Sequence, residues 1–230
     1  MSRSSLFVDI GNSAVKWRTP DSVVFSQGVD FFTPNSLPKA EILWVSAVAN
    51  LSIVDAIKET HANVKLVSSL KQHEKLTIAY EDPTMLGSDR FFAMLGAIKS
   101  FPEISLLIID VGSAVTFDII DHIGIHKGGL IMPGIASLRK SFPKFSTDDL
   151  TLKSVSIQSN TQKAWQSGTH AMLISAINAQ IESFESSYPS GQVLISGGTV
   201  NEIINELSKS IKPFDNLVLD GLESYSHSMG

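Results

Sequence analysis

Two short segments of the chain combine an acidic side chain with a glycine in the same way. Asp9 ends an apolar run and is followed two residues later by Gly11, and Asp110 is followed in the same way by Gly112. Small hydroxyl or amide residues come next in both segments, and another apolar run begins after them. Glycine lets a backbone turn tightly and approach a ligand closely, so that its N–H groups can converge on a phosphate. The two segments therefore predict a pair of phosphate-binding turns.

The shared context of these segments indicates an internal duplication. Residues 6–15 read LFVDIGNSAV and residues 107–115 read LIIDVGSAV, about one small domain further along the chain. The alternative is two unrelated β-turns, because short motifs also recur by chance. The sequence contains no G-x-x-x-x-G-K-[ST] and no G-x-G-x-x-G, which excludes a Walker motif and a dinucleotide fingerprint.

Further glycines lie in the second half of the chain. Gly197, Gly198 and Thr199 stand between a predicted strand and a predicted helix, a position typical of a nucleotide contact at a helix N-terminus. The alternative is that these glycines only shape the joint between strand and helix. A second cluster, residues 128–134, places three glycines around an apolar centre.

Asp89 is a candidate for acid–base chemistry. It falls in the first turn of a helix predicted from residue 88, where the macrodipole favours an ionised carboxylate. Phosphoryl transfer needs a carboxylate that orients a hydroxyl and accepts its proton. The neighbouring Arg90 can pair with a substrate carboxylate through two hydrogen bonds. The alternative for Asp89 is an ordinary charge at a helix N-terminus.

Four other polar residues also have simpler interpretations. Asp110 can cap its own turn, and Lys16 can be a solvated strand residue between Val15 and Trp17. His122 and His126 flank a hairpin turn, and they are interpreted as surface residues rather than metal ligands because no carboxylate cluster completes a ligand set.

The elements that must position these groups alternate between strands and helices. Apolar runs and turn residues predict two α/β lobes of related design, 1–104 and 105–230, each opening with an antiparallel meander and continuing into parallel strands. Long helices are expected at 88–100 and 161–185, the latter with an apolar face that includes Trp165 and Met172. An exposed loop is expected at 142–149, a helix at 200–211, a strand at 217–219, and a loosely specified tail after Gly221.

Composition excludes several classes of protein. The 230 residues include no cysteine, so disulfide frameworks, thiolate nucleophiles, cysteine zinc sites and iron–sulfur clusters are ruled out. With 18 basic and 23 acidic side chains, the net charge of −5 argues against a nucleic-acid partner. No apolar run approaches the roughly 18 residues of a membrane span, and none resembles a signal peptide, so we expect a soluble cytoplasmic protein without a membrane partner.

Together and in this order, the motifs resemble type III pantothenate kinase, a family of the acetate and sugar kinase, Hsp70 and actin superfamily. The segments that carry the resemblance are 9–16, 87–90, 110–118 and 128–134. The resemblance implies an α/β fold of duplicated ribonuclease H-like lobes with mixed sheets, in an actin-like ATPase architecture. It also implies a homodimer.

The implied activity is ATP-dependent phosphorylation of the primary hydroxyl of pantothenate to 4'-phosphopantothenate, the first step of coenzyme A biosynthesis. One alternative is a kinase for another small hydroxyl substrate. Another is a non-catalytic nucleotide-binding regulator of the same fold, which is disfavoured because Asp9 and Asp89 are both present.

The resemblance also implies roles for individual residues. Asp89 is the proton acceptor, Asp110 holds a monovalent cation, K⁺ or NH₄⁺, and Asp9 lies nearest the Mg²⁺ that accompanies ATP, through water. The residues implied to bind ATP are Asp9, Ile10, Gly11, Asn12, Ser13, Ala14, Val15, Lys16, Ser113, Gly197 and Gly198. Those implied to bind pantothenate are Tyr80, Gly87, Ser88, Asp89, Arg90 and Thr161. Ser13 and Ser113 stand where the family more often has threonine, which keeps the hydroxyl and puts affinity in doubt more than activity.

Overall fold

The structure, a computed structural model, describes residues 4–151, 155–208 and 211–229. The chain forms two compact units. The first comprises Met1–Glu103, Gly124–His126 and Asn216–Gly230, and the second comprises Ile104–Ile123 and Lys127–Asp215. The lobes expected from the sequence, 1–104 and 105–230, differ from these units in the placement of Ile104, which belongs to the second unit, and of 124–126 and 216–230, which belong to the first.

The first unit is built on a five-stranded mixed sheet with the strand order β3-β2-β1-β4-β5. β1 pairs antiparallel with β2 and parallel with β4, which in turn pairs parallel with β5. The strands are β1 (Ser5–Ile10), β2 (Ala14–Arg18), β3 (Val24–Gly28), β4 (Ile42–Ala47) and β5 (Val64–Val67). The meander and the parallel pairing expected from the sequence are both confirmed.

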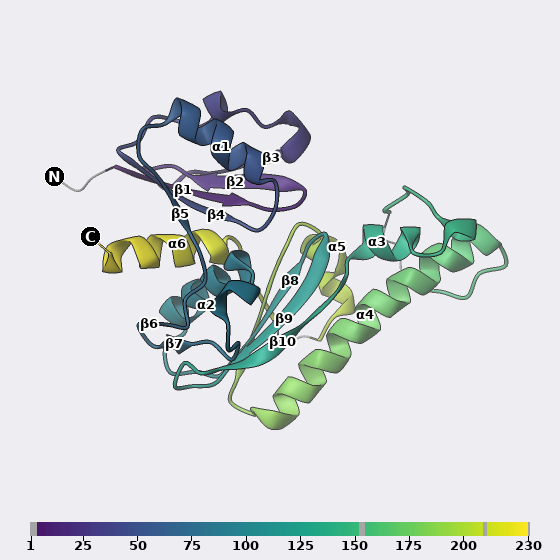
Figure 1. Cartoon of the computed structure of the whole chain (residues 1–230). Coiled ribbons are helices and arrows are strands. Elements are labelled where there is room, and N and C mark those ends of the chain that lie inside the picture. Colours follow the sequence, from purple (N-terminus) through teal and green to yellow (C-terminus); the bar gives the residue numbers. More distant parts are fainter. Residues whose placement is uncertain (1–3, 152–154, 209–210, 230) are drawn as a thin grey trace. The chain divides into compact units, whose positions relative to one another are not determined.

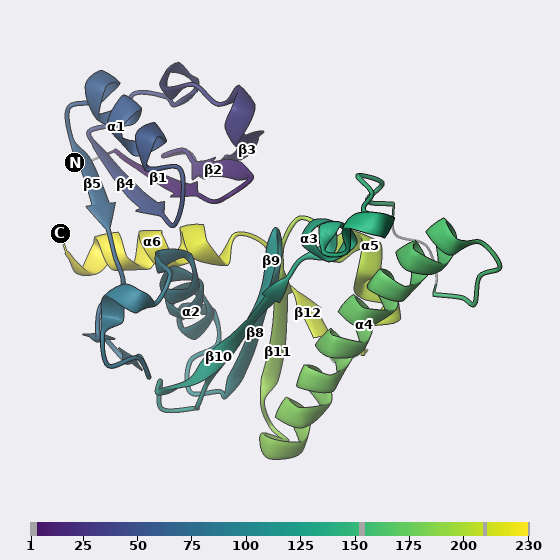
Figure 2. The ribbon, with the colours of Figure 1, turned by 45° about the vertical axis from the view of Figure 1, so that its right-hand side comes forward.

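Helices cover both faces of this sheet (Figure 2). On one face, Val54 and Ile57 of α1 (Leu51–Thr60) pack against apolar side chains of β1, β2 and β4. The other face is covered by α2 (Ser88–Ser100) and α6 (Leu217–Ser228), and Trp44 of β4 meets Tyr225 of α6 edge to face. Burial on both faces explains why residues 42–47 form a nearly continuous apolar run.

The second unit repeats the same sheet order, β10-β9-β8-β11-β12. Its strands are β8 (Leu106–Val111), β9 (Ala114–Ile120), β10 (His126–Pro133), β11 (Gln192–Ser196) and β12 (Ile211–Pro213). β8 pairs antiparallel with β9 and parallel with β11, as β1 does with β2 and β4. The turn after β8 is one residue shorter than the turn after β1. The predicted duplication is therefore confirmed.

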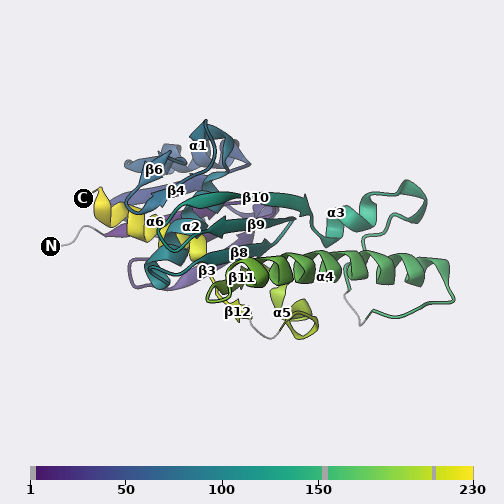
Figure 3. The same ribbon diagram turned by 90° about the horizontal axis from the view of Figure 1, so that it is seen from below.

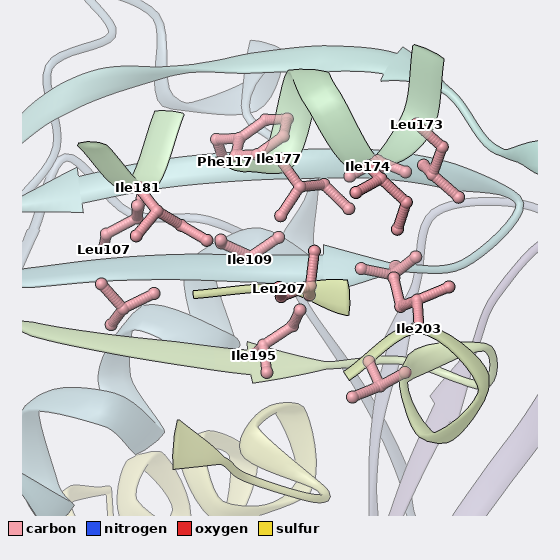
Figure 4. Close-up of a cluster of buried hydrophobic side chains, with 14 of the residues drawn as sticks. Leu107, Ile109, Phe117, Leu173, Ile174, Ile177, Ile181, Ile195, Ile203 and Leu207 are labelled. Atoms are coloured by element: carbon pink, nitrogen blue, oxygen red, sulfur yellow. The ribbon is translucent and has the colours of Figure 1, made fainter. Parts of the chain in front are cut away.

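One long helix, α4 (Thr161–Ser187), runs across a face of the second sheet (Figures 1 and 3). Its side chains Leu173, Ile174, Ile177 and Ile181 point toward the strands and form the core of this unit (Figure 4). Met172, expected on the same apolar face, is instead 56% exposed.

Short elements complete the described chain. They are the paired strands β6 (Gln72–His73) and β7 (Leu76–Thr77), the helices α3 (Ile135–Lys140) and α5 (Val200–Ile203), and the 3-10 helices η1 (Val29–Phe31), η2 (Pro34–Ser36), η3 (Pro83–Met85), η4 (Pro143–Phe145) and η5 (Ile204–Glu206). Residues 142–149 are mostly exposed, as expected, with η4 inside them. Across the described ranges, no helix is long and apolar enough to cross a membrane.

The C-terminal region corrects two expectations. The strand expected at 217–219 and the loose tail after Gly221 are instead the single helix α6, anchored by Arg18, whose guanidinium contacts Asp220 (2.5 Å) and Glu223 (2.9 Å). A methyl group at Gly221 would lie 1.8 Å from the carbonyl oxygen of Phe92, so this glycine permits the close contact between α6 and α2. The sequence did not predict this helix because glycine, here Gly221, has a low helix propensity.

The helix expected at 200–211 ends early, and residues 211–213 form a strand instead. Asn178 of α4 explains the ending, because its side-chain amide donates to the carbonyl oxygen of Glu206 (3.2 Å) and accepts from the N–H of Ser208 (3.1 Å). These contacts occupy backbone groups that a continuing helix would use.

Candidate active site

The turn between β1 and β2 is held by hydrogen bonds on both sides. The N–H of Gly11 donates to the carbonyl oxygen of Ala14 (3.0 Å), and the N–H of Val29 donates to that of Ser13 (3.1 Å). The side-chain amide of Asn50 donates to the carbonyl oxygen of Gly11 (2.8 Å). Carbonyl oxygens repel anions, so their engagement by the protein's own donors suits a phosphate-binding turn.

Glycine is not demanded by the conformation of either predicted phosphate turn. Neither Gly11 nor Gly112 has a positive φ. A methyl group would lie 3.4 Å from the carbonyl oxygen of Ala14 at the first position and 3.5 Å from Oδ2 of Asp110 at the second, which are ordinary contacts. The sequence argument that tight turning requires these glycines is therefore wrong. Their missing side chains instead leave backbone that a ligand can approach closely.

Asp9 and the start of α2 lie at one edge of the first sheet. Asp9 faces Lys16 across the antiparallel pair with β2 and Ser46 across the parallel pair with β4. The hydroxyl of Ser46 lies 2.9 Å from that of Ser88, the first residue of α2, and both serines are buried. In sheets of this kind, ligands bind beyond the carboxyl ends of parallel strands. The predicted phosphate turn and the predicted catalytic segment therefore share one edge of the first unit.

The N-terminus of α2 holds Asp89 in a defined position. Oδ1 of Asp89 accepts a hydrogen bond from the N–H of Arg90 (2.7 Å). A methyl group at Gly87 would lie only 2.6 Å from this same oxygen, so the carboxylate occupies space that any larger residue would fill. This contact explains why the first position of the Gly-x-Asp-Arg segment is glycine.

Two hydrogen-bonding groups fix the chain that leads into α2. Asp82 caps η3 by accepting from the N–H of Thr84 (2.9 Å), and hydrogen bonds from the Thr84 side chain and backbone lower the pKa of Asp82. The hydroxyl of Ser69 donates to the carbonyl oxygen of Leu86 (2.8 Å). The backbone is thus held just before Gly87.

Arg90 and Tyr80 are brought together within the first unit. Arg90 is 6% exposed, and its Nη1 donates to the hydroxyl of Tyr80 (3.2 Å). Its guanidinium carbon lies 5.9 Å from the centre of the Tyr80 ring, within the range of a cation–π contact. Five of the six residues expected to bind pantothenate, Tyr80 and 87–90, therefore lie in this unit.

In the second unit, close backbone contacts support the turn after β8. The N–H of Gly134 donates to the carbonyl oxygen of Ser113 (3.1 Å). A methyl group at Gly134 would lie 2.3 Å from the carbonyl oxygen of Gly112, and one at Gly197 would lie 2.3 Å from that of Val111. Gly197 also has φ +118, so glycine is required there by both conformation and space.

Two side-chain hydrogen bonds link the end of β8 to residues 196–199. The hydroxyl of Ser196 donates to Oδ1 of Asp110 (2.8 Å), and that of Thr199 donates to the carbonyl oxygen of Val111 (3.0 Å). Gly198 is exposed, and a methyl group there would meet nothing within 4 Å. The structure thus gathers Asp110, Ser113 and 197–198 at one end of the second sheet.

Thr161, the sixth expected pantothenate contact, is the exposed first residue of α4 in the second unit. A polar cavity of about 230 Å³ lies beside the next turns of this helix. Its lining residues are Arg139, Asp149, Thr151, Gln158, Lys163, Gln166 and Ser167. Burial lowers the pKa of Arg139, which tethers the adjacent loop by donating to the carbonyl oxygens of Asp149 and Thr151.

The histidines differ from their expected placement. His122 is exposed, whereas His126, expected at the surface, is only 1% exposed. Over the parts of the chain that the structure describes, no group of three or more histidine, aspartate or glutamate side chains is arranged to hold a metal ion.

Three supporting residues were missed from the sequence: Ser46, Asn50 and Ser196. Ser46 did leave a signal, because it is a buried hydroxyl within the apolar run at 42–47. Asn50 adopts the left-handed conformation (φ 53) that asparagine tolerates better than most residues, but its contact with the turn at Gly11 is long-range.

Comparison with known proteins shows the family to which the chain belongs. The family model of type III pantothenate kinase matches residues 5–183. A type III pantothenate kinase of Hahella chejuensis is 30% identical, over 97% of this chain and 98% of that protein.

Solved structures confirm the fold class. A Campylobacter jejuni protein described as a Baf family transcriptional activator has a TM-score of 0.65 and 21% identity, over 97% of this chain and 98% of that one. A Sinorhizobium meliloti protein described as a 2-dehydro-3-deoxygalactonokinase has a TM-score of 0.62 and 12% identity, over 98% and 96%. These similarities show the fold, and the family model together with the full-length relative identifies the chain as a member of the type III pantothenate kinase family.

Proposed function

We propose that this protein transfers the γ-phosphoryl group of ATP to the primary hydroxyl of pantothenate, giving 4'-phosphopantothenate and ADP in the first step of coenzyme A biosynthesis. One observation carries the proposal. In a chain of this family, Asp89 stands at the start of α2, at the same sheet edge as the turn that follows Asp9.

Asp89 orients the substrate hydroxyl and accepts its proton. In the transfer, the hydroxyl oxygen bonds to the γ-phosphorus, the bond from that phosphorus to the bridging oxygen breaks, and ADP leaves with that electron pair. Asp89 is half-buried, and the N–H of Arg90 and the helix N-terminus both stabilise its ionised form. The carboxylate is therefore available as a base before the reaction begins.

Arg90 binds the carboxylate of pantothenate. Its buried guanidinium donates to the Tyr80 hydroxyl, and the planar geometry of a guanidinium suits a carboxylate, which it can bind through two parallel hydrogen bonds. Asp89 and Arg90 are consecutive, so the reacting hydroxyl and the carboxylate are fixed by neighbouring residues of one helix. Gly87, Ser88, Tyr80 and Thr161 complete the proposed substrate contacts.

The ATP phosphates bind the glycine turns. Residues 9–16 and Ser113 offer backbone N–H groups and hydroxyls, and Gly11 and Gly112 lack the side chains that would obstruct a phosphate. Gly197 and Gly198 contact the nucleotide, and the open space around Gly198 suits such a contact.

Two cations accompany the reaction. Mg²⁺, held mainly by ATP phosphates and water with Asp9 nearby, would neutralise charge on the transferring group. The absence of a carboxylate cluster in the described residues fits an ion bound largely through phosphate and water. Asp110 would hold K⁺ or NH₄⁺, and the missing side chain of Gly112 leaves room beside its Oδ2.

The proposed enzyme is a cytoplasmic homodimer that forms through the second unit. β10 is the edge strand of its sheet, yet it exposes Leu130 (51%) and Ile131 (65%), and α4 exposes Met172 (56%). Exposed apolar side chains on an edge strand are typical of an interface. Ile131→Glu should convert the dimer to a monomer in sedimentation equilibrium, and a monomeric wild-type protein would contradict the proposal.

The activity is tested by ADP formation from ATP, Mg²⁺ and K⁺, with and without pantothenate. ADP formation that depends on pantothenate supports the proposed reaction. Faster turnover with another alcohol from a panel of small hydroxyl compounds would indicate a kinase for a different substrate. ATP binding without turnover of any alcohol would indicate a nucleotide-binding regulator.

A further inference from the structure

We propose that His126 is a positioning residue for the substrate: through Tyr80, it aims the Arg90 guanidinium at the substrate carboxylate. This inference rests on the proposed function. His126 begins β10, but it belongs to the first compact unit, whereas the rest of β10 belongs to the second. It is 1% exposed, which is unusual for a histidine in a hairpin.

The segment that carries His126 is fixed against residues 75–77. The N–H of Thr77 donates to the carbonyl oxygen of Gly124 (3.0 Å), and Thr77 forms an isolated parallel bridge with Ile125. Gly124 has φ +90, and a methyl group there would lie 2.2 Å from the carbonyl oxygen of Lys75. Only glycine allows this close approach. The approach places His126 beside Ala79 and Tyr80.

His126 contacts both the ring and the backbone of the Tyr80 region. Its ring is parallel to that of Tyr80 to within 5°, with centroids 6.2 Å apart, in the outer part of the range of aromatic contacts. Its Nδ1 accepts a long hydrogen bond from the N–H of Ala79 (3.4 Å).

Tyr80 then connects His126 to Arg90. Its hydroxyl accepts from Nη1 of Arg90, and its carbonyl oxygen accepts from the ammonium of Lys71 (2.7 Å). Lys71 also donates to the carbonyl oxygen of Ile78 (3.1 Å), so the backbone on either side of Ala79 is restrained. Tyr80 is thus one of the groups that orient the guanidinium, and His126 is one of the groups that orient the Tyr80 ring.

The test compares pantothenate with the neutral analogue in which the carboxylate is reduced to a primary alcohol. His126→Ala should lower kcat/KM for pantothenate by about tenfold, mainly through KM, the scale of one hydrogen bond and one ring contact. The change for the neutral analogue should be small, and KM for ATP should not change. A purely structural defect would lower kcat/KM for both substrates alike.

Two further variants define the mechanism. In an Arg90→Met background the carboxylate is no longer bound by the guanidinium, so adding His126→Ala should have little further effect on the preference for pantothenate. His122→Ala is the matched control, because this exposed histidine lies four residues away in the same hairpin and should leave both substrates unaffected.

The outcomes separate the inference from the proposed function. A wild-type protein that does not phosphorylate pantothenate overturns both. An active wild type whose preference for pantothenate over the neutral analogue is unchanged in His126→Ala overturns only the inference. If the alanine variant does not fold, His126→Leu replaces it, because leucine occupies much of the same space with neither the ring nor the acceptor; an unchanged preference in that variant also overturns the inference.

Discussion

Substituting Gly87 by alanine should impair catalysis while leaving the fold intact. The new methyl carbon would lie 2.6 Å from Oδ1 of Asp89, and the next neighbour, Cγ1 of Val48, would be at an ordinary 3.5 Å. To reach a normal contact, the carboxylate must retreat by roughly 0.8 Å. Because the obstructing atom, Oδ1, lies at the end of a flexible side chain, we expect the Asp89 side chain to move and the backbone to keep its position.

The size of the effect follows from that displacement. A misplacement of about 1 Å in a reacting group can lower a rate by about 10²-fold, so we expect a loss of that order in kcat. The loss in the free energy of unfolding should stay near 1 kcal/mol. The φ of −53° at Gly87 suits alanine, so the main cost is that alanine is a poorer N-cap residue than glycine. Steady-state kinetics and thermal unfolding measure the two quantities separately.

A double-mutant cycle identifies the cause of the loss. If Gly87→Ala acts by displacing the Asp89 carboxylate, it should have almost no further effect on the residual activity of Asp89→Ala. Equal losses in the wild-type and Asp89→Ala backgrounds, or a wild-type kcat for Gly87→Ala alone, would refute the reasoning.

Two further predictions concern the second phosphate turn and the C-terminal helix. Turnover should rise when Na⁺ is replaced by K⁺ or NH₄⁺, and Asp110→Asn should abolish this response; equal wild-type rates in the three salts would contradict the role of Asp110. Gly221→Ala places a methyl carbon 1.8 Å from the carbonyl oxygen of Phe92, so it should lower the free energy of unfolding by about 3 kcal/mol. Urea denaturation measures this loss through tryptophan fluorescence, since Trp44 contacts Tyr225 of α6, and an unchanged midpoint would refute the proposed packing.

Much of the architecture could be predicted because its determinants are local. The apolar runs before Asp9 and Asp110 and the shared turn pattern predicted two matching sheets, and the structure has the same strand order in both. The start and end of α2 were also predictable, since a helical apolar pattern stops at Phe101 and Pro102.

The features that were missed depend on contacts between distant segments. Gly221 allows a helix to pack closely on α2, but in sequence it resembles a helix breaker. His126 is buried because residues 124–126 pack beside 75–80, and Asn50 reaches a turn almost forty positions earlier in the chain. No pattern within a single segment carries such information.

Phosphorylation of pantothenate by this chain, with Asp89 as the base, can be measured directly. The most direct measurement is mass-spectrometric detection of phosphopantothenate from ATP, Mg²⁺, K⁺ and pantothenate, for the wild type and for Asp89→Asn. We predict product from the wild type and a rate lower by about 10²- to 10⁴-fold for a variant that still folds and binds ATP. No product from the wild type, or equal rates from both proteins, would contradict the claim.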